Sequence, residues 1–163
     1  MKMVKGTIIG LTMAASFAGN ATQEQQNMNF SVAVSQGCSI TGVADTAFST
    51  IDGNFTSNTD SSSGGVTVLC TSGTPYSIGL GNGQHYNGTS RTMTDGNSNF
   101  IAYGVYQNNG YSTAWGDIGS GNEVSGTGNG ANQSSTVYAR IPSGQTAVPA
   151  GNYSDVVVVT LNF

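Results

Sequence analysis

Few side chains in this sequence are suited to acid–base or nucleophilic catalysis. His85 is the only histidine, and it lies in a polar stretch rich in Gly and Asn, with no nucleophile-elbow motif in the chain. A serine hydrolase needs a histidine that an acid orients beside the nucleophile. A glycosidase needs two carboxylates that converge in a cleft, whereas the acids here stand mostly in turn-forming sequences, where Asp caps backbone amides. The sequence therefore predicts that the protein is not an enzyme.

Two motifs look like ligand-binding loops but lack the residues that such loops need. Residues 79–83 are rich in glycine, as phosphate loops are, yet no lysine or helical pattern follows them. Residues 95–99 open like a calcium loop, but Phe100 takes the place of its glycine and Tyr106 the place of its final glutamate. Both segments are predicted to be turns, and neither a metal nor a cofactor is expected.

The first 21 residues have the pattern of a secretory signal peptide. Lys2 and Lys5 precede a short uncharged stretch, 6–20, and small residues close it at Ala21, with an alternative cleavage site at Ala18. The stretch is too short and too weakly apolar for a membrane span. We expect cleavage after Ala21 and a mature chain long enough for one domain, exported from the cytoplasm.

Cys38 and Cys70 are the only cysteines. An even pair in an exported chain predicts a disulfide in preference to two free thiols. A zinc site would need further Cys or His ligands at close spacing, and redox catalysis would need a Cys-x-x-Cys pair; the sequence has neither. The predicted bond would stabilise the fold by roughly 3–4 kcal/mol in the chain-entropy model.

The mature chain carries few charges, and most of them are negative. Only Arg91 and Arg140 remain against eight acidic residues, a formal net charge of −6. Two isolated cations do not supply the phosphate contacts that nucleic acid or an anionic membrane surface requires. The composition therefore excludes nucleic-acid binding, and no membrane insertion is expected.

Aromatic residues gather between positions 100 and 115. Tyr103, Tyr106, Tyr111 and Trp115 could present flat faces to a sugar ring. The alternative is that Phe100 and Tyr103 or Tyr106 pack in the core while Trp115 covers its rim. We favour packing over sugar binding.

No segment after the signal peptide shows helical periodicity. Short runs of alternating apolar and polar residues are separated by clusters of Gly, Asn and Asp, which is typical of an all-β sandwich. The longest loop, and the one expected to be most mobile, is 116–133. The predicted strands are 28–34, 65–71, 76–80, 100–106, 134–141 and 153–163.

The final predicted strand carries its apolar residues on one parity, and no later element is present in the sequence to cover them. An exposed apolar strand edge is a template for a further strand. We therefore expect this strand to pair with an earlier segment of its own chain or with a strand from another molecule. The residues of the apolar face are Tyr153, Val157, Val159, Leu161 and Phe163.

A long motif stands at the C-terminus: residues 138–145, then 149–155 and the Val/Thr strand. Three further motifs precede it: Gly37-Cys38, the second cysteine strand 65–70, and Arg91-Thr92-Met93 before 103–106. In order and spacing these motifs resemble the spore coat U family, which includes secreted pilus subunits of the archaic (Csu-type) chaperone–usher system. One departure is Phe48-Ser49-Thr50, where the family usually has a glycine after the Phe. The similarity covers the chain from about Met28 to Phe163.

The resemblance implies an immunoglobulin-like β-sandwich that lacks its last strand. In such subunits the final strand, here 153–163, borders an open hydrophobic groove. A periplasmic chaperone first lends a strand to the groove, and at the outer-membrane usher the N-terminal extension of the next identical or related subunit replaces it. The implied function is a structural pilus subunit on the cell surface that supports attachment and biofilm formation, with no cofactor.

The donor strand of this chain is expected in the N-terminal extension, 22–36, ahead of the pilin domain, 37–163. Its apolar residues alternate, although the same stretch could instead be the first strand of the domain. Two alternative functions remain: a pilus-tip or adaptor adhesin that binds a surface or glycan, and a self-contained outer-coat domain. The expected donor residues are Met28, Phe30, Val32 and Val34.

Overall fold

The computed structural model describes residues 22–51 and 55–163. The predicted signal peptide, 1–21, lies outside the described residues. Contacts divide the chain between Ala33 and Val34, and the second unit, 34–163, contains every strand. The predicted domain boundary at residue 37 stays a prediction.

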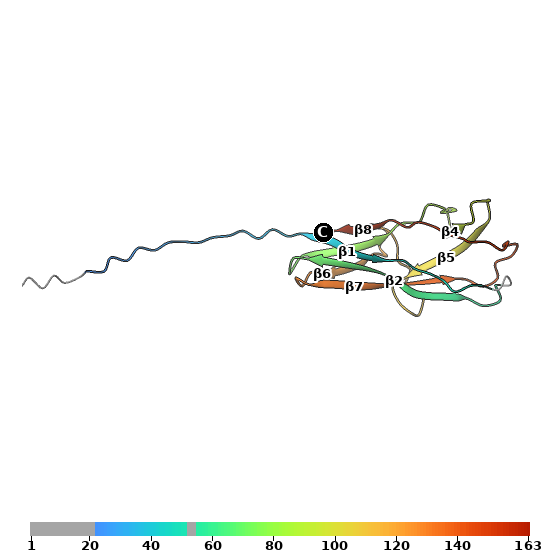
Figure 1. Cartoon of the computed structure of the whole chain (residues 1–163), viewed down its shortest axis with the longest axis horizontal. Helices are drawn as coiled ribbons and strands as arrows, with labels where there is room; N and C mark the ends of the chain where they lie inside the picture. The colour runs from blue at the N-terminus through green and yellow to red at the C-terminus, as the bar shows by residue number, and fades with distance from the viewer. Residues whose placement is uncertain (1–21, 52–54) are drawn as a thin grey trace, which may run out of the picture. The chain divides into compact units, whose positions relative to one another are not determined.

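The unit from Val34 to Phe163 is built from antiparallel strands in two sheets, and the described residues contain no helix (Figure 1). The larger sheet has five strands in the order β1-β2-β7-β5-β4, and the smaller has three in the order β6-β3-β8. The predicted all-β fold is confirmed. The strands are β1 (Cys38–Ala44), β2 (Thr59–Cys70), β3 (Pro75–Leu80), β4 (Arg91–Thr94), β5 (Phe100–Tyr106), β6 (Val124–Thr127), β7 (Asn132–Ile141) and β8 (Val159–Asn162).

The strands form because their apolar residues recur at every second position and so share one face. In β5 the residues Ile101, Tyr103 and Val105 are buried, and the residues between them are more exposed. The same alternation runs through the second half of β2 and of β7. The inward faces together make one core cluster.

Trp115 lies in the core and does not cover its rim, contrary to the sequence-based expectation. Its side chain is fully buried, and its indole Nε1 donates to the carbonyl of Ile78 at 2.8 Å. Phe100, expected in the core, is 51% exposed, because it stands on the outward parity of β5. Tyr103 is buried and Tyr106 is half-buried.

Three predicted elements differ from the structure. Of the predicted final strand, 153–163, only Val159–Asn162 is a strand (β8), because the residues before it are held by single backbone bonds and one isolated bridge and not by a continuous ladder. Residues 28–34 form no strand, and the first strand is β1, which the sequence did not predict. A register shift between Ile40 and Gly42 breaks the two-residue period of β1, which hides it from pattern analysis. The predicted loop 116–133 contains strand β6, which pairs with β3.

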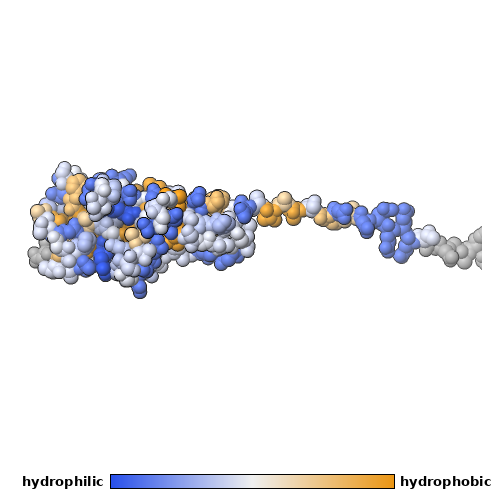
Figure 2. All heavy atoms as spheres, turned by 180° about the vertical axis from the view of Figure 1, so that it is seen from behind, coloured by the Kyte–Doolittle hydropathy of each residue, from blue (hydrophilic) through white to orange (hydrophobic). Residues whose placement is uncertain are grey.

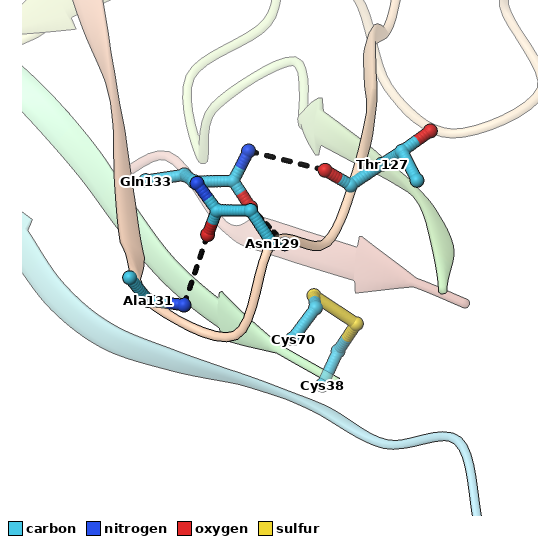
Figure 3. The surroundings of a disulfide bond; sticks show 6 residues. All are labelled: Cys38, Cys70, Thr127, Asn129, Ala131 and Gln133. Carbon is cyan, nitrogen blue, oxygen red and sulfur yellow. Dashed lines mark hydrogen bonds between the residues drawn. A yellow bond between two sulfur atoms is a disulfide. The ribbon is translucent and has the colours of Figure 1, made fainter. Parts of the chain in front are cut away.

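The predicted disulfide between Cys38 and Cys70 is present and joins directly opposed residues of β1 and β2 (Figure 3). The β6–β7 loop lies beside it, where Gly130 donates its backbone N–H to the carbonyl of Cys70 at 3.1 Å. A Cβ at Gly128 would stand 2.4 Å from the carbonyl oxygen of Thr71, so this loop approaches β2 too closely for a side chain. The disulfide end of the sandwich is therefore tightly packed.

Candidate strand-binding groove

Among the described residues, β1, β4, β6 and β8 are the edge strands of the two sheets, and β1 and β8 are the two whose free edges flank a groove. β1 pairs only with β2, and β8 pairs only with β3. The carbonyls of Val156 and Val158 accept from the backbone of Gln84 and Gly81, on the β3 side. Because backbone groups alternate in direction along a strand, those of Val157 point to the opposite, unpaired edge. A ladder of free donors and acceptors is thus available to a further strand.

A groove with a volume of about 480 Å³ opens between these two edges. One wall, here called the β1 wall, consists of residues 43–48 without Ala47, and the other, here called the terminal wall, consists of residues 153–159 without Val158. Apolar surface is visible on the sandwich in Figure 2. The floor is formed by inward residues of both sheets: Gly65, Val66, Leu80, Met93, Tyr103, Val105, Val137 and Ala139.

The groove opens at one end of the two edge strands. β1 and β8 approach each other directly, and the cavity lining includes neither Cys38 nor Leu161. It includes instead the end of β1 and the residues that precede β8. The space for an added strand therefore lies mainly beside the segment that leads into β8.

The structure places the predicted residues of the final strand as follows. Tyr153, Val157, Val159 and Leu161 are partly buried and pack against the core. The first three line the groove, whereas Leu161 lies beyond its lining. Phe163 follows the last residue of β8 and is 61% exposed, so it does not line the groove.

The β1 wall was not predicted as part of the site. The hydroxyl of Ser63 accepts the backbone N–H of Ala47 at 2.9 Å, and the hydroxyl of Ser61 donates to the Ala47 carbonyl at 2.6 Å. Gly64 leaves room for Thr46, whose Oγ1 would lie 1.9 Å from a Cβ at that position. These contacts hold the β1 wall on β2 without help from an added strand. In the sequence, the only signal of these contacts was the Ser-rich first half of β2, and a composition of this kind is also typical of loops.

The terminal wall contains one buried carboxylate, Asp155, with a side chain only 2% exposed. Its Oδ2 accepts from the Tyr103 hydroxyl at 2.7 Å, and its Oδ1 accepts the backbone N–H of Gln84 at 2.9 Å and that of His85 at 3.3 Å. His85 Nδ1 lies 3.0 Å from the same oxygen. Burial raises the pKa of Asp155, but the hydrogen bonds from Tyr103, His85 and the backbone outweigh it and leave the pKa below its ordinary value. Burial, together with the bond to Asp155, raises the pKa of Tyr103 far above the usual range.

In the sequence, His85 was weighed as a catalytic base and the acidic residues as possible catalytic carboxylates, and the structure brings His85 and one of these acids, Asp155, together. The donors around the carboxylate are backbone N–H groups of the β3–β4 loop and of Val156, the His85 ring and the Tyr103 phenol. No serine or cysteine contributes to this hydrogen-bonded cluster in the described part of the chain. The contacts of this cluster join the terminal wall, β5 and the β3–β4 loop, so the role that they support is structural.

The predicted donor residues lie in a described stretch of the chain that has no secondary structure. Met28, Phe30, Val32 and Val34 are all strongly exposed, Phe30 at 88%. Figure 2 shows an apolar stretch on the extended N-terminal segment. Four exposed apolar side chains in alternation are costly in water and favour burial against a partner.

Two further classes of site find no candidate in the described ranges. Across 22–51 and 55–163, no group of three or more His, Cys, Asp or Glu side chains is arranged to hold a metal ion. The same residues include no helix with the length and hydropathy to cross a membrane.

Comparison with known proteins shows the family to which the chain is similar. The model of the Spore Coat Protein U domain matches residues 24–160. No curated protein matches the sequence. A similar solved structure is the complex of CsuC and CsuE, a chaperone–tip adhesion subunit pre-assembly complex from the archaic chaperone–usher Csu pili of Acinetobacter baumannii. The match has 27% sequence identity and a TM-score of 0.56, and it covers 80% of this chain but only 40% of that one.

Proposed function

This chain belongs to the Spore Coat Protein U domain family, and we propose that it is a structural pilus subunit that polymerises by donating a strand to its neighbour. The observation that carries the proposal is the groove between β1 and the terminal wall, with two unpaired edges above an apolar floor. A strand added there continues the backbone ladder, and its alternate side chains enter the groove. The protein is structural and not catalytic.

The strand that fills the groove in the fibre is the N-terminal segment of another copy or of a related subunit. Met28, Phe30, Val32 and Val34 supply apolar side chains at every second position. Each side chain of this size contributes about 1.5–3 kcal/mol when it is fully buried. Several such residues, together with the ladder, are enough to offset the ordering of a short segment and the cost of association.

Before assembly the groove is covered by a periplasmic chaperone, and the outer-membrane usher exchanges that strand for the donor of the next subunit. Support comes from the similar CsuC–CsuE structure, which is a chaperone–subunit complex. Residues 1–21 direct export to the periplasm, and the fibre stands on the cell surface, where it supports attachment and biofilm formation. The mature chain has a formal net charge of −6 from two arginines and eight acids, which favours a basic chaperone.

The donor assignment is tested by Phe30→Asp in cells that also produce the chaperone and the usher. The expected result is a normal chaperone–subunit complex in the periplasm and no surface fibre, because the chaperone fills the groove with its own strand while a charged side chain blocks the donor. Asn29→Asp is the matched control: it adds the same charge one residue away, on the opposite parity, and should leave fibres intact. Normal fibres from Phe30→Asp would contradict the assignment.

A tip subunit is the second candidate, because the similar solved structure contains a chaperone–tip adhesion subunit complex. A tip subunit accepts a donor strand but needs to donate none. Immunogold labelling distinguishes the two roles: label along the whole fibre indicates a shaft subunit, and label confined to the end indicates a tip. We expect label along the fibre, since the apolar alternation of 28–34 would otherwise have no partner.

A further inference from the structure

Asp155 is an unusual residue for its position. It stands on the inward parity of the terminal wall, between Tyr153 and Val157, where its neighbours are apolar. A buried carboxylate costs several kcal/mol unless hydrogen bonds compensate for its lost hydration. A side chain that is 2% exposed therefore needs a local structural reason.

The reason lies in the segments that the carboxylate joins. Tyr103 belongs to β5, in the larger sheet, whereas Gln84 and His85 belong to the β3–β4 loop, and both reach Asp155 at hydrogen-bond distance. The loop wraps closely around the carboxylate, since a Cβ at Gly83 would stand 2.0 Å from Asp155 Oδ2. Gly83 also has a φ of 84°, in the region that glycine adopts most readily.

The terminal wall has little regular pairing to hold it. The β3–β8 ladder begins only at Val159, opposite Leu80. Before it, the wall is attached by the Gly81–Val158 and Gln84–Val156 backbone bonds and by an isolated bridge between Thr94 and Ser154. Most of the groove lining on this side is therefore the weakly paired stretch in which Asp155 is the centre of side-chain bonding.

We infer that Asp155 is a positioning residue of the groove: its carboxylate holds the terminal wall against β5 and the β3–β4 loop, so that the free edge is in place before a donor strand arrives. This inference rests on the proposed function. Asp155 belongs to the groove lining, but its carboxylate oxygens bond to Tyr103 and the β3–β4 loop, so its effect is assigned to the position of the wall. It is therefore specific to the accepting role, because the donor residues 28–34 lie in a separate part of the chain.

The test measures acceptance and donation separately in mature chains. For acceptance, a fluorescent peptide of residues 22–36 is titrated into a chain that carries Phe30→Asp, which removes its own donor. Asp155→Asn should weaken peptide binding about tenfold or more, since it keeps the shape but replaces one acceptor by an amide and removes the charge. Tyr103→Phe, which removes one hydrogen bond and keeps the ring, should weaken it less. Asp60→Asn, the same change at an exposed carboxylate paired with Arg140, should have no effect.

For donation, the Asp155→Asn chain with its native N-terminus is offered to the Phe30→Asp acceptor. Unchanged donation together with impaired acceptance supports the inference. Normal acceptance by Asp155→Asn would overturn it, and so would an equal loss of both roles, which indicates general unfolding.

A second readout does not depend on peptide binding. In wild-type protein the backbone amides of Gln84 and His85 should exchange slowly with solvent, and Asp155→Asn should accelerate exchange there and across 156–159. If no chain binds the peptide, the proposed function fails, and the exchange data alone decide the role of Asp155. Unchanged exchange in the variant would overturn that role.

Discussion

The guanidinium Nη2 of Arg91 donates to the backbone carbonyl of Trp115 at 2.9 Å. The same Nη2 also donates to the carbonyl of Leu80 at 2.7 Å, and Nε donates to that of Gly81 at 2.8 Å. Burial lowers the pKa of Arg91, while the nearby Tyr103 and Asp155 oppose that effect. One cation thus satisfies three carbonyls at the end of β3, next to the last residues of the terminal wall.

Arg91→Lys should destabilise the domain by about 1–3 kcal/mol, because an ammonium does not reproduce the planar fork that reaches three carbonyls. The measurement is denaturant unfolding of the monomeric Phe30→Asp chain, followed by the fluorescence of the single tryptophan, which is buried in the core. Arg140→Lys is the control, since its pair with Asp60 is partly exposed and should contribute less than about 1 kcal/mol. Equal effects of the two substitutions would contradict the role given to Arg91.

Loss of the Cys38–Cys70 disulfide should lower the free energy of unfolding by roughly 3–4 kcal/mol, because the bond closes a long loop in the unfolded chain. The two cysteines are 32 residues apart. The double variant Cys38→Ser and Cys70→Ser and the reduced wild type should unfold at similar denaturant concentrations. Adding reductant to the double variant serves as the control and should change nothing; a shift there would point to an effect other than disulfide loss.

Stability should fall in acid partly through Asp155. Its pKa in the folded protein lies below the ordinary value of 3.8, so the folded state favours the ionised carboxylate. That contribution is present above about pH 4 and is lost as the pH falls through the lower folded value. Asp155→Asn should therefore show a weaker loss of stability as the pH falls below about 4. Asp60 and Asp95, whose pKa values are also lowered, remain in both chains and cancel in the comparison.

Val159→Asp should prevent recovery of a stable chaperone complex, because it places a charge in the groove lining and against the core. Thr160→Asp is the matched control: it lies one residue further on, faces solvent, and should leave the complex intact. Co-purification of subunit with tagged chaperone from the periplasm measures both. A Val159→Asp complex recovered in wild-type amount would count against the groove as the chaperone site.

Local patterns in the sequence were enough for most of the central strands. The alternation in 100–106 predicted β5 with its observed limits, and 76–80 and 134–141 predicted β3 and β7 to within two residues. β1 escaped prediction because its register shift breaks the alternation. β6 escaped because four residues, Val124–Thr127, with two of them small, resemble loop sequence.

The site was only half predictable, for a physical reason. The parity of Tyr153, Val157 and Val159 shows that they turn inward, but it does not show whether another strand covers them. The β1 wall depends on Ser61 and Ser63, far along the chain from Ala47, and polar residues of this kind carry no distinctive local signal.

The sequence by itself determined the class of the protein: strands from two-residue alternation, turns from Gly, Asn and Asp, a disulfide from two cysteines, and a family from its C-terminal signature. These properties arise from neighbours along the chain. Only the tertiary structure decided that two unpaired edges flank one apolar floor and that Asp155 meets Tyr103 and the β3–β4 loop beside it. Both depend on which distant segments lie side by side, and strand pairing is set by long-range packing that no local pattern encodes.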